Sequence, residues 1–221
     1  MAIDTARSFW SLVTRLGEAQ ILLPALAAML LWFTLRLRAS AVAVAWVASV
    51  GVAALITTVT KVAFIGWGVG YAPLDFTGVS GHAMFAAAVL PLLAAASVSG
   101  ERARTLGISI GYVVALLIAV SRVTTGAHSV SEAFIGFLLG SMASAWAIAA
   151  ARLPPTHAPK ALIVALALWL FLTPAGAPPS RTHSWVTQLA LTLSGREQPY
   201  TREMMRLDYM QHRSGAAYRQ G

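Results

Sequence analysis

The stretch SRVTTGAHSVSE, residues 121–132, separates two long apolar runs of the sequence, residues 105–121 and 133–151. It places Arg122, His128 and Glu132 within eleven residues at the border between these runs. Ionisable side chains in or beside a membrane span are costly, and they mark candidate functional sites. The stretch therefore predicts two membrane helices joined by a short turn that carries a polar site.

The composition as a whole is that of a membrane protein. Of the 221 residues, 57% are hydrophobic and 11% are charged, and the mean hydropathy is +0.70, whereas soluble domains have about 25% charged residues. A helix needs about 20 apolar residues to cross a bilayer, and six stretches without Asp, Glu, Lys or Arg approach or exceed that length: residues 19–35, 39–60, 76–100, 105–121, 133–151 and 161–180. We therefore expect an all-α membrane bundle of about six transmembrane helices.

Three regions are expected along the chain. Residues 1–18 carry charges that interrupt any apolar signal-peptide core, and their apolar side chains predict an amphipathic segment at the membrane interface. Residues 19–180 form the transmembrane domain, in which three prolines limit the helical part of the sixth span to residues 161–173. Residues 181–221 form a polar basic tail, and beyond Ser194 we expect a surface helix with a frayed end.

The net charge and the absence of cysteine narrow the possible partners. The formal charge is +8, but the basic residues are scattered singly among loops and the tail, which excludes the basic stripe of a nucleic-acid-binding domain. Attraction to anionic lipid headgroups explains this charge better. The chain has no cysteine, so disulfides and thiolate chemistry are excluded.

Five polar residues are predicted to meet at one end of the bundle. Consecutive spans alternate in direction, so the loop between spans two and three and the loop between spans four and five emerge on the same face. Lys61 and His82 flank the first of these loops, while Arg122, His128 and Glu132 flank the second. Each residue alone is better explained as an interface anchor, a helix residue or a first-turn acid. Together, a set of such groups indicates a site.

This set of side chains suits reactions of an anionic substrate. His128 and Glu132 are four residues apart, so on a helix that begins near Ala127 the carboxylate could hold one ring nitrogen of His128. The other nitrogen would then be free to act as a nucleophile or as a general base. Lys61 and Arg122 provide fixed cations, and a guanidinium matches the oxygens of phosphate.

The run DFTGVSGH, residues 75–82, is interpreted as a glycine-containing turn that enters the third helix. Its exposed amides, with the hydroxyl of Ser80, would form an anion cradle at the positive end of that helix. His82 lies in the first helical turn, where it could protonate a leaving oxygen as a general acid.

A metal-dependent reaction is less favoured by the sequence. Only Asp75 and Glu132 among the eight acidic residues lie near the predicted site, whereas magnesium prefers several oxygen ligands. Two histidines and Glu132 could bind zinc, but the neighbouring Lys61 and Arg122 would repel it. We therefore expect phosphoryl transfer without a metal or other cofactor.

These residues resemble the three motifs of the type 2 phosphatidic acid phosphatase (PAP2) superfamily, specifically its membrane-embedded lipid phosphate phosphatases. The family pattern is Lys, six residues, Arg-Pro; then Pro-Ser-Gly-His; then Ser-Arg, five residues, His, three residues, Asp. The matching residues here run from position 61 to 132, about a third of the chain: Lys61, Ser80, Gly81, His82, Ser121, Arg122, His128 and Glu132.

The resemblance implies a six-helix fold and a lipid phosphatase that needs no metal. It implies that His128 forms a phosphohistidine, that Glu132 orients His128, and that His82 protonates the leaving group. Substrate phosphate would be held by a further set of residues, Lys61, Ser80, Gly81 and Arg122. The substrate class would be a lipid monophosphate or diphosphate such as undecaprenyl diphosphate, phosphatidic acid or phosphatidylglycerol phosphate.

The chain departs from the family pattern at three positions. The family's Arg-Pro falls at Gly68-Val69, Val79 replaces the proline before the serine, and Glu132 replaces an aspartate. The extra methylene of Glu132 changes how His128 is held. A charge-assisted hydrogen bond is worth about 1.5–3 kcal/mol, so the missing arginine weakens phosphate binding unless Arg181 or another tail residue replaces it.

The distribution of basic residues predicts the orientation. The loops on the face away from the site carry six basic residues, Arg36, Arg38, Arg102, Arg104, Arg152 and Lys160. The positive-inside rule therefore places this face in the cytoplasm and the site in the periplasm of a bacterial inner membrane. Five arginines of the tail oppose this assignment if all six spans cross, and an incomplete sixth span would remove the conflict. The abundance of alanine and arginine indicates a GC-rich bacterium.

Other classes of function are compatible with parts of this pattern. A transporter or proton relay would place ionisable groups at several depths, whereas here they gather at one end. A relative that binds lipid phosphates without turnover is suggested by Gly68. A vanadate-dependent haloperoxidase would share the site residues, but six apolar spans make it remote. The sequence leaves the particular lipid and the oligomeric state open.

Overall fold

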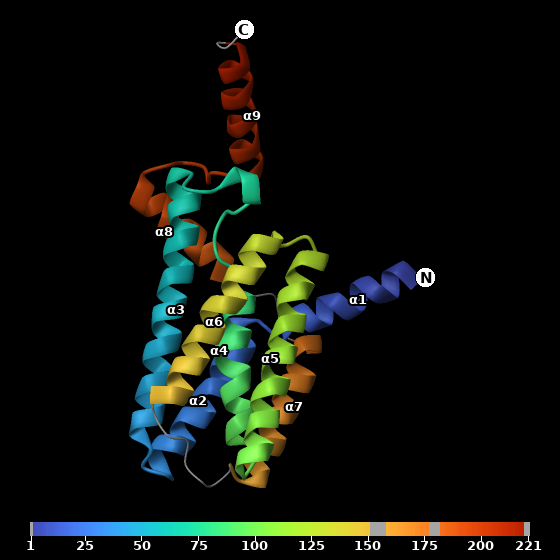
Figure 1. Ribbon diagram of the computed structural model, residues 1–221, viewed down its shortest axis with the longest axis vertical. Coiled ribbons are helices and arrows are strands. Elements are labelled where there is room, and N and C mark those ends of the chain that lie inside the picture. The colour runs from blue at the N-terminus through green and yellow to red at the C-terminus, as the bar shows by residue number, and fades with distance from the viewer. Residues whose placement is uncertain (1, 151–157, 177–181, 219–221) are drawn as a thin grey trace.

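The structure is a computed structural model that describes residues 2–150, 158–176 and 182–218 (Figure 1). In these residues it is helical, with α1 (Ala2–Arg15), α2 (Ala19–Leu35), α3 (Ser40–Trp67), the short 3₁₀ helix η1 (Ala72–Leu74), α4 (Gly81–Ala96), α5 (Glu101–Thr124), α6 (Val130–Ala150), α7 (Lys160–Gly176), α8 (Thr182–Ser194) and α9 (Arg202–Tyr218). The described residues contain no strand, only a single bridge between Tyr71 and Phe76. The predicted all-α class is confirmed.

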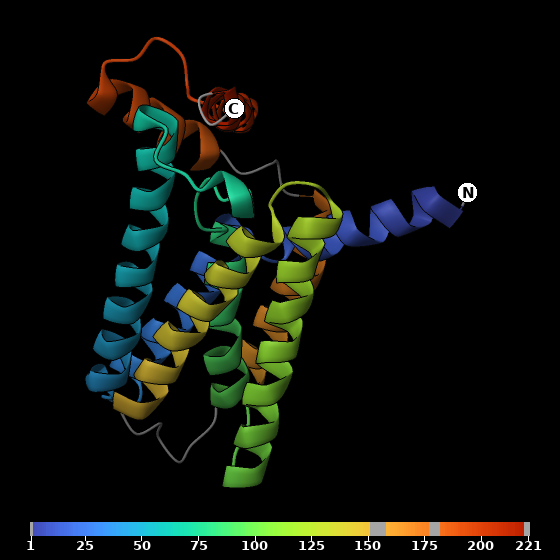
Figure 2. The same cartoon turned by 45° about the horizontal axis from the view of Figure 1, so that its top comes forward.

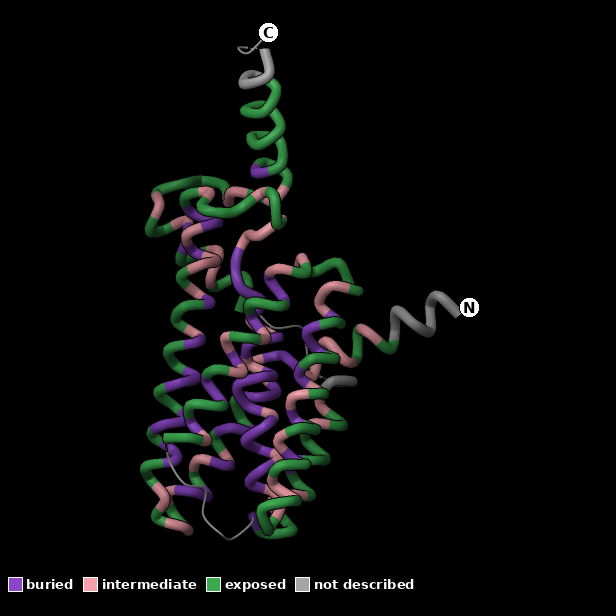
Figure 3. The backbone as a smooth tube through the Cα atoms, in the orientation of Figure 1, coloured by how far each residue is buried: buried purple, intermediate pink, exposed green. Residues whose placement is uncertain are grey.

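Helix α4 forms the centre of the bundle and packs against α2, α3, α5 and α6. Most of its residues are buried, including Met84 and Leu92, which are fully buried. Figure 3 shows this buried segment surrounded by helices whose outer residues are exposed. Because α4 contacts protein on most sides, it can be short: its 16 residues extend about 24 Å.

Small residues allow the neighbouring helices to approach α4 closely. A Cβ atom at Gly111 of α5 would lie 2.5 Å from the Cα of Pro91, and one at Gly140 of α6 would lie 2.1 Å from the carbonyl oxygen of Met84. Neither distance is possible for real atoms, so these positions require glycine. Close approach through small residues is the usual packing mode of membrane helices, because lipid provides no hydrophobic force between them.

The number of long membrane-spanning helices is smaller than expected. Three helices, α3, α5 and α6, are long and apolar enough to cross a membrane, and α1 with α2, which are bent by 43°, could form a fourth span. Helices α4 and α7 are shorter apolar helices. The apolar run 76–100 overestimated the third span because residues 76–80 form an irregular entry to α4. The described helices therefore do not establish six crossings.

Several element boundaries also differ from the prediction. Helix α3 continues past Lys61 to Trp67, and α6 begins at Val130 rather than near Ala127. Helix α7 continues past residue 173 to Gly176, because a proline near a helix end removes few hydrogen bonds. The two later prolines of this region, Pro178 and Pro179, lie outside the described residues.

Helices near both ends of the chain, α1 and α8, pack on the bundle. The N-terminal segment forms the helix α1, which projects from the side of the bundle in Figure 2. Val13 of α1 and Leu16, which follows the helix, pack against the core. Part of the predicted tail also packs on the bundle. Helix α8 contacts α3, and Val186 and Ala190 join a second apolar cluster there. The expected surface helix beyond Ser194 is α9.

Candidate active site

A cavity of about 560 Å³ lies at the end of the bundle where α3 and α5 end and α4 and α6 begin. Helices α8 and α9 lie at the same end of the bundle, as Figure 1 shows, and both contribute residues to the cavity wall. Of the predicted site residues, five line the cavity: Lys61, Gly81, His82, Arg122 and His128. The structure thus brings together residues from four separate parts of the sequence.

The imidazole of His128 is held by the buried carboxylate of Glu132. The Nδ1 atom of His128 lies 2.7 Å from Oε2 of Glu132, whose side chain is 0% exposed. The predicted contact is confirmed, although the expected helical register is wrong, because His128 lies in the loop before α6 and Glu132 lies in the first helical turn. With Nδ1 occupied by Glu132, the free ring nitrogen of His128 is Nε2.

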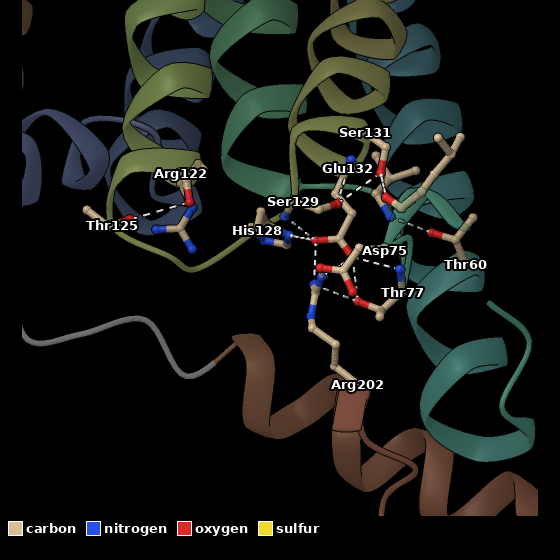
Figure 4. Close-up of polar contacts among 12 residues, drawn as sticks. Thr60, Asp75, Thr77, Arg122, Thr125, His128, Ser129, Ser131, Glu132 and Arg202 are labelled. Atoms are coloured by element: carbon tan, nitrogen blue, oxygen red, sulfur yellow. Dashed lines mark hydrogen bonds and ion pairs between the residues drawn. The ribbon is translucent and has the colours of Figure 1, made fainter. Parts of the chain in front are cut away.

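Further hydrogen bonds fix both oxygens of the Glu132 carboxylate (Figure 4). The amide and the hydroxyl of Thr77 donate to Oε1 over 2.6 and 2.5 Å, and the amide of Ser129 donates to Oε2 over 3.1 Å. Arg202 of α9 donates to both carboxylate oxygens, over 2.8 and 2.9 Å. A carboxylate with this many donors is held as the anion, so it keeps the proton of His128 on Nδ1.

The two predicted cations come from the ends of α3 and α5. Lys61 lies against Gly78, where a Cβ atom would be 3.0 Å from Cγ of Lys61. Gly78 has a φ of +138°, so a glycine is needed both for this backbone conformation and for the close approach. Arg122 donates from one terminal nitrogen to Oγ1 of Thr14 over 2.8 Å. Its buried Nε atom has no partner among the described residues.

The predicted open anion cradle before α4 is wrong in part. The amide of Ser80 donates to the carbonyl of Glu132 over 3.1 Å, and the amide of Val79 donates to Oγ1 of Thr60 over 3.1 Å. With the amide of Thr77 also engaged, these groups hold the loop to α6 and α3 and are not available to an anion. Ser80 is fully buried and does not line the cavity, and its hydroxyl has no partner among the described residues. Gly81 does line the cavity.

The charge of the cavity favours anions. Among its described lining residues, none is acidic, while Lys61, Arg122 and Arg202 are cationic. Burial lowers the pKa of His128, and the nearby Lys61 and Arg122 lower it further, against the opposing effect of Glu132. His128 is therefore neutral at pH 7, as a nucleophile or general base must be.

Two residues of the tail that line the cavity were not identified from the sequence. His183 of α8 lines the cavity, and burial and the charge of Lys61 lower its pKa. Arg202 lines the cavity and pairs with Asp75 as well as Glu132. No sequence signal connects these residues to the motifs, because they follow the last motif by at least fifty positions. Arg181, the tail residue considered by name, lies outside the described residues.

Gly68, at the position where the PAP2 pattern has an arginine, has a structural role of its own. Gly68 caps α3 in the left-handed conformation, with a φ of +74°, and its amide donates to Phe64. A Cβ atom here would lie 3.2 Å from the ring of Tyr200. The amide of Tyr200 in turn donates to the carbonyl of Ile65 over 2.9 Å. The tail therefore covers the position where the arginine would stand and brings Arg202 to the site two residues later.

The described residues contain no group of three or more His, Asp or Glu side chains that could hold a metal ion. His82 and His128 belong to a cavity that also holds Lys61 and Arg122, and the two cations oppose binding of a third. The absence of a metal requirement stays a prediction.

The chain is similar to a Klebsiella pneumoniae protein described as an uncharacterized 22.5 kDa protein in cps region, with 33% identity over 204 residues. The similarity covers 87% of this chain and 95% of the Klebsiella protein. The chain belongs to the same family as this protein. No family model and no solved structure matches the chain. The similarity to the Klebsiella protein extends over most of both chains and is not confined to one segment.

Proposed function

We propose that the protein is an integral-membrane lipid phosphatase of the PAP2 type, which hydrolyses a lipid monophosphate or diphosphate through a phosphohistidine. The observation that supports this proposal most strongly is the pairing of His128 with the buried Glu132 at the wall of a cationic cavity. A neutral imidazole with one nitrogen fixed by a carboxylate has its second nitrogen available for attack.

In the first step, the lone pair of Nε2 of His128 attacks phosphorus. The bond from phosphorus to the leaving oxygen breaks, and the electron pair of that bond stays on the oxygen. The ring becomes a phosphoimidazolium whose positive charge is balanced by Glu132 through the Nδ1 proton. Lys61 and Arg122 stabilise the charge on the remaining phosphoryl oxygens.

His82 is the proposed source of the proton for the leaving oxygen, since it lines the same cavity. Burial and the cationic neighbours oppose a proton on His82 when no anion is bound, and a bound phosphate dianion offsets the effect of the cations. In the second step, neutral His82 removes a proton from a water molecule, and the resulting hydroxide attacks phosphorus. Phosphate leaves, and the Nε2 lone pair of His128 is restored.

The proposed orientation places the cavity on the periplasmic side of a bacterial inner membrane. Helix ends and loops on the opposite face carry Arg36, Arg38, Arg102, Arg104 and Lys160, as the positive-inside rule requires for the cytoplasmic side. Tail arginines lie at the cavity end, but Arg202 and Arg206 are paired with acidic residues there. Anionic headgroups and a lipid phosphate are the proposed partners.

The test is phosphate release by the purified full-length protein in detergent. The substrates are undecaprenyl diphosphate, phosphatidic acid and phosphatidylglycerol phosphate, each in excess EDTA. His128→Ala should abolish release, whereas His212→Ala should not, because His212 is exposed on α9. A rapid quench with lipid labelled in its phosphate should trap a labelled, acid-labile phosphoprotein in the wild type. The His128→Ala variant should give none.

The alternative outcomes separate the other functions. Binding of these lipids by a folded wild-type protein that releases no phosphate would indicate a lipid-phosphate-binding relative. Release that disappears in EDTA and returns with a divalent cation would contradict the metal-independent mechanism. Release that persists in His128→Ala would exclude the phosphohistidine.

A further inference from the structure

The guanidinium of Arg202 joins two parts of the molecule that are distant in sequence. One terminal nitrogen donates to both oxygens of Glu132, over 2.8 and 2.9 Å. The other donates to the side chain of Asp75 over 2.5 Å and to its main-chain carbonyl over 2.8 Å. Figure 4 shows the Arg202 side chain extending from the start of α9 to these carboxylates.

The neighbouring Arg206 provides a natural comparison within the same helix. It also pairs with Asp75, over 3.0 and 2.8 Å. Among the described residues, however, it makes no hydrogen bond to Glu132, and its side chain is 55% exposed. The side chain of Arg202 is 28% exposed and the side chain of Glu132 is 0% exposed. Both arginines anchor α9 to Asp75, and only Arg202 also reaches the carboxylate that holds His128.

Asp75 lies in the irregular segment before α4 and is the second carboxylate, beside Glu132, that holds Arg202. It has a φ of +51° at the end of η1, a conformation that aspartate tolerates better than most residues. Although burial raises the pKa of Asp75, hydrogen bonds from Arg206 and Arg202 hold it below its ordinary value. Asp75 is therefore an anion that fixes the direction of the Arg202 fork.

We propose that Arg202 is a positioning residue: by bridging Asp75 and Glu132, it makes the C-terminal helix α9 set both the orientation and the basicity of His128. Arg202 acts through Glu132 and need not touch the substrate. In the proposed reaction it completes a chain of contacts from α9 through Glu132 to the nucleophile.

The electrostatic effect of this bridge has a definite sign. Glu132 stabilises a positive charge on His128, and Arg202 offsets that stabilisation because it shares the same carboxylate. The other titratable or charged groups at this cavity are Lys61 of α3, His82 of α4, Arg122 of α5, His183 of α8 and Tyr200, while Asp75 pairs with the other end of the Arg202 fork. None of these carries a negative charge beside His128. Loss of the Arg202 charge therefore raises the proton affinity of His128.

The same effect acts on the covalent intermediate, and this step rests on the proposed function. Phosphoimidazolium carries a positive charge that Glu132 stabilises. Because Arg202 shares the charge of Glu132, the intermediate is less stable than it would be beside an isolated carboxylate, and water displaces the phosphate faster. Removing Arg202 should therefore lengthen the lifetime of the phosphoprotein as well as change the pH profile.

The deciding measurement is the titration of His128 by NMR in detergent-solubilised full-length protein with labelled histidine, with the His128 signal assigned from His128→Ala. Arg202→Gln should raise the pKa of His128 by about 1 pH unit, because one opposing charge is removed. Arg206→Gln is the matched control and should leave it unchanged. Arg202→Lys keeps a cation without the fork, so its His128 should titrate between wild type and Arg202→Gln.

These outcomes test the role of Arg202 without requiring turnover. An unchanged His128 titration in Arg202→Gln, or the same shift in Arg206→Gln, would overturn the inference. If Arg202→Gln does not fold, the Arg202→Lys variant decides. A wild-type pKa of His128 in Arg202→Lys would overturn the inference, and a raised pKa of His128 would support it. A wild type that releases no phosphate would remove the proposed reaction but leave the His128 titration as a valid test of the bridge.

Discussion

Replacing Glu132 by glutamine tests both the stability and the chemistry assigned to the buried carboxylate. The change keeps the side-chain shape but removes the negative charge of the carboxylate. The oxygens of this carboxylate accept hydrogen bonds from His128, Thr77, Ser129 and Arg202. Removing one partner of a buried ion pair costs about 3–5 kcal/mol. Because Arg202 is 28% exposed and can turn toward water, we expect the lower end of this range, about 3 kcal/mol.

The expected loss can be measured in two independent assays. A loss of about 3 kcal/mol corresponds to a fall in Tm of about 6–12 °C for a chain of this size. In catalytic triads, removing the charge that fixes the histidine tautomer lowers kcat by about 10⁴-fold, and a similar loss of phosphate release is expected here. Thermal unfolding in detergent and phosphate release would be measured for Glu132→Gln beside Glu203→Gln, an exposed acidic residue on α9. Wild-type Tm and wild-type release in Glu132→Gln would refute the assignment.

Three further predictions follow from the same geometry. Burial lowers the pKa of His128 below its ordinary 6.5. Between the folded and the unfolded pKa of His128, the folded protein therefore binds fewer protons than the unfolded chain. Both kcat/KM and Tm should hold down to pH 6.5 and fall at lower pH, and a loss centred above pH 7 would contradict this. Gly68→Ala should lower Tm more than Gly195→Ala. Both glycines have left-handed φ angles, +74° and +70°, but only Gly68 faces an aromatic ring. Equal losses of Tm would show that the ring contact is unimportant. Gly140→Ala should prevent normal folding because its Cβ would overlap the backbone of α4. Gly51→Ala, with no atom within 4 Å of its Cβ, should instead stabilise α3 by about 0.5–1 kcal/mol. Size-exclusion chromatography and Tm would distinguish the two variants, and a well-folded Gly140→Ala would contradict the packing.

Some features of the site could be predicted because they depend on short spacings. His128 and Glu132 are only four positions apart, so almost any local geometry at a helix start keeps them within contact distance, and the hydrogen bond formed even though α6 begins later than expected. Lys61 and Arg122 could be placed at the same end because alternating spans determine which loops share a face. By contrast, the availability of the amides around Ser80 could not be predicted, since it depends on the carbonyl of Glu132.

The exact role of the tail was also beyond sequence patterns. Its polar composition correctly indicated a surface helix, but the apolar side chains of α8 that pack on α3 are too few to form a recognisable pattern. Gly68, where the PAP2 pattern has an arginine, suggested from the sequence that a phosphate contact is missing. In the structure it is a left-handed helix cap covered by Tyr200, and the absence of a side chain there leaves room for the segment that leads to Arg202.

The sequence by itself determined an all-helical apolar chain and a polar face that holds His82, His128 and their cationic neighbours. It did so because helical periodicity, span length and the cost of charge in lipid act locally along the chain. Only the tertiary structure decided how long α4 could be and which groups surround Glu132. Those features depend on contacts between distant segments, such as Arg202 with Glu132, 70 positions apart, and the energy of such contacts arises only when folding removes both partners from water.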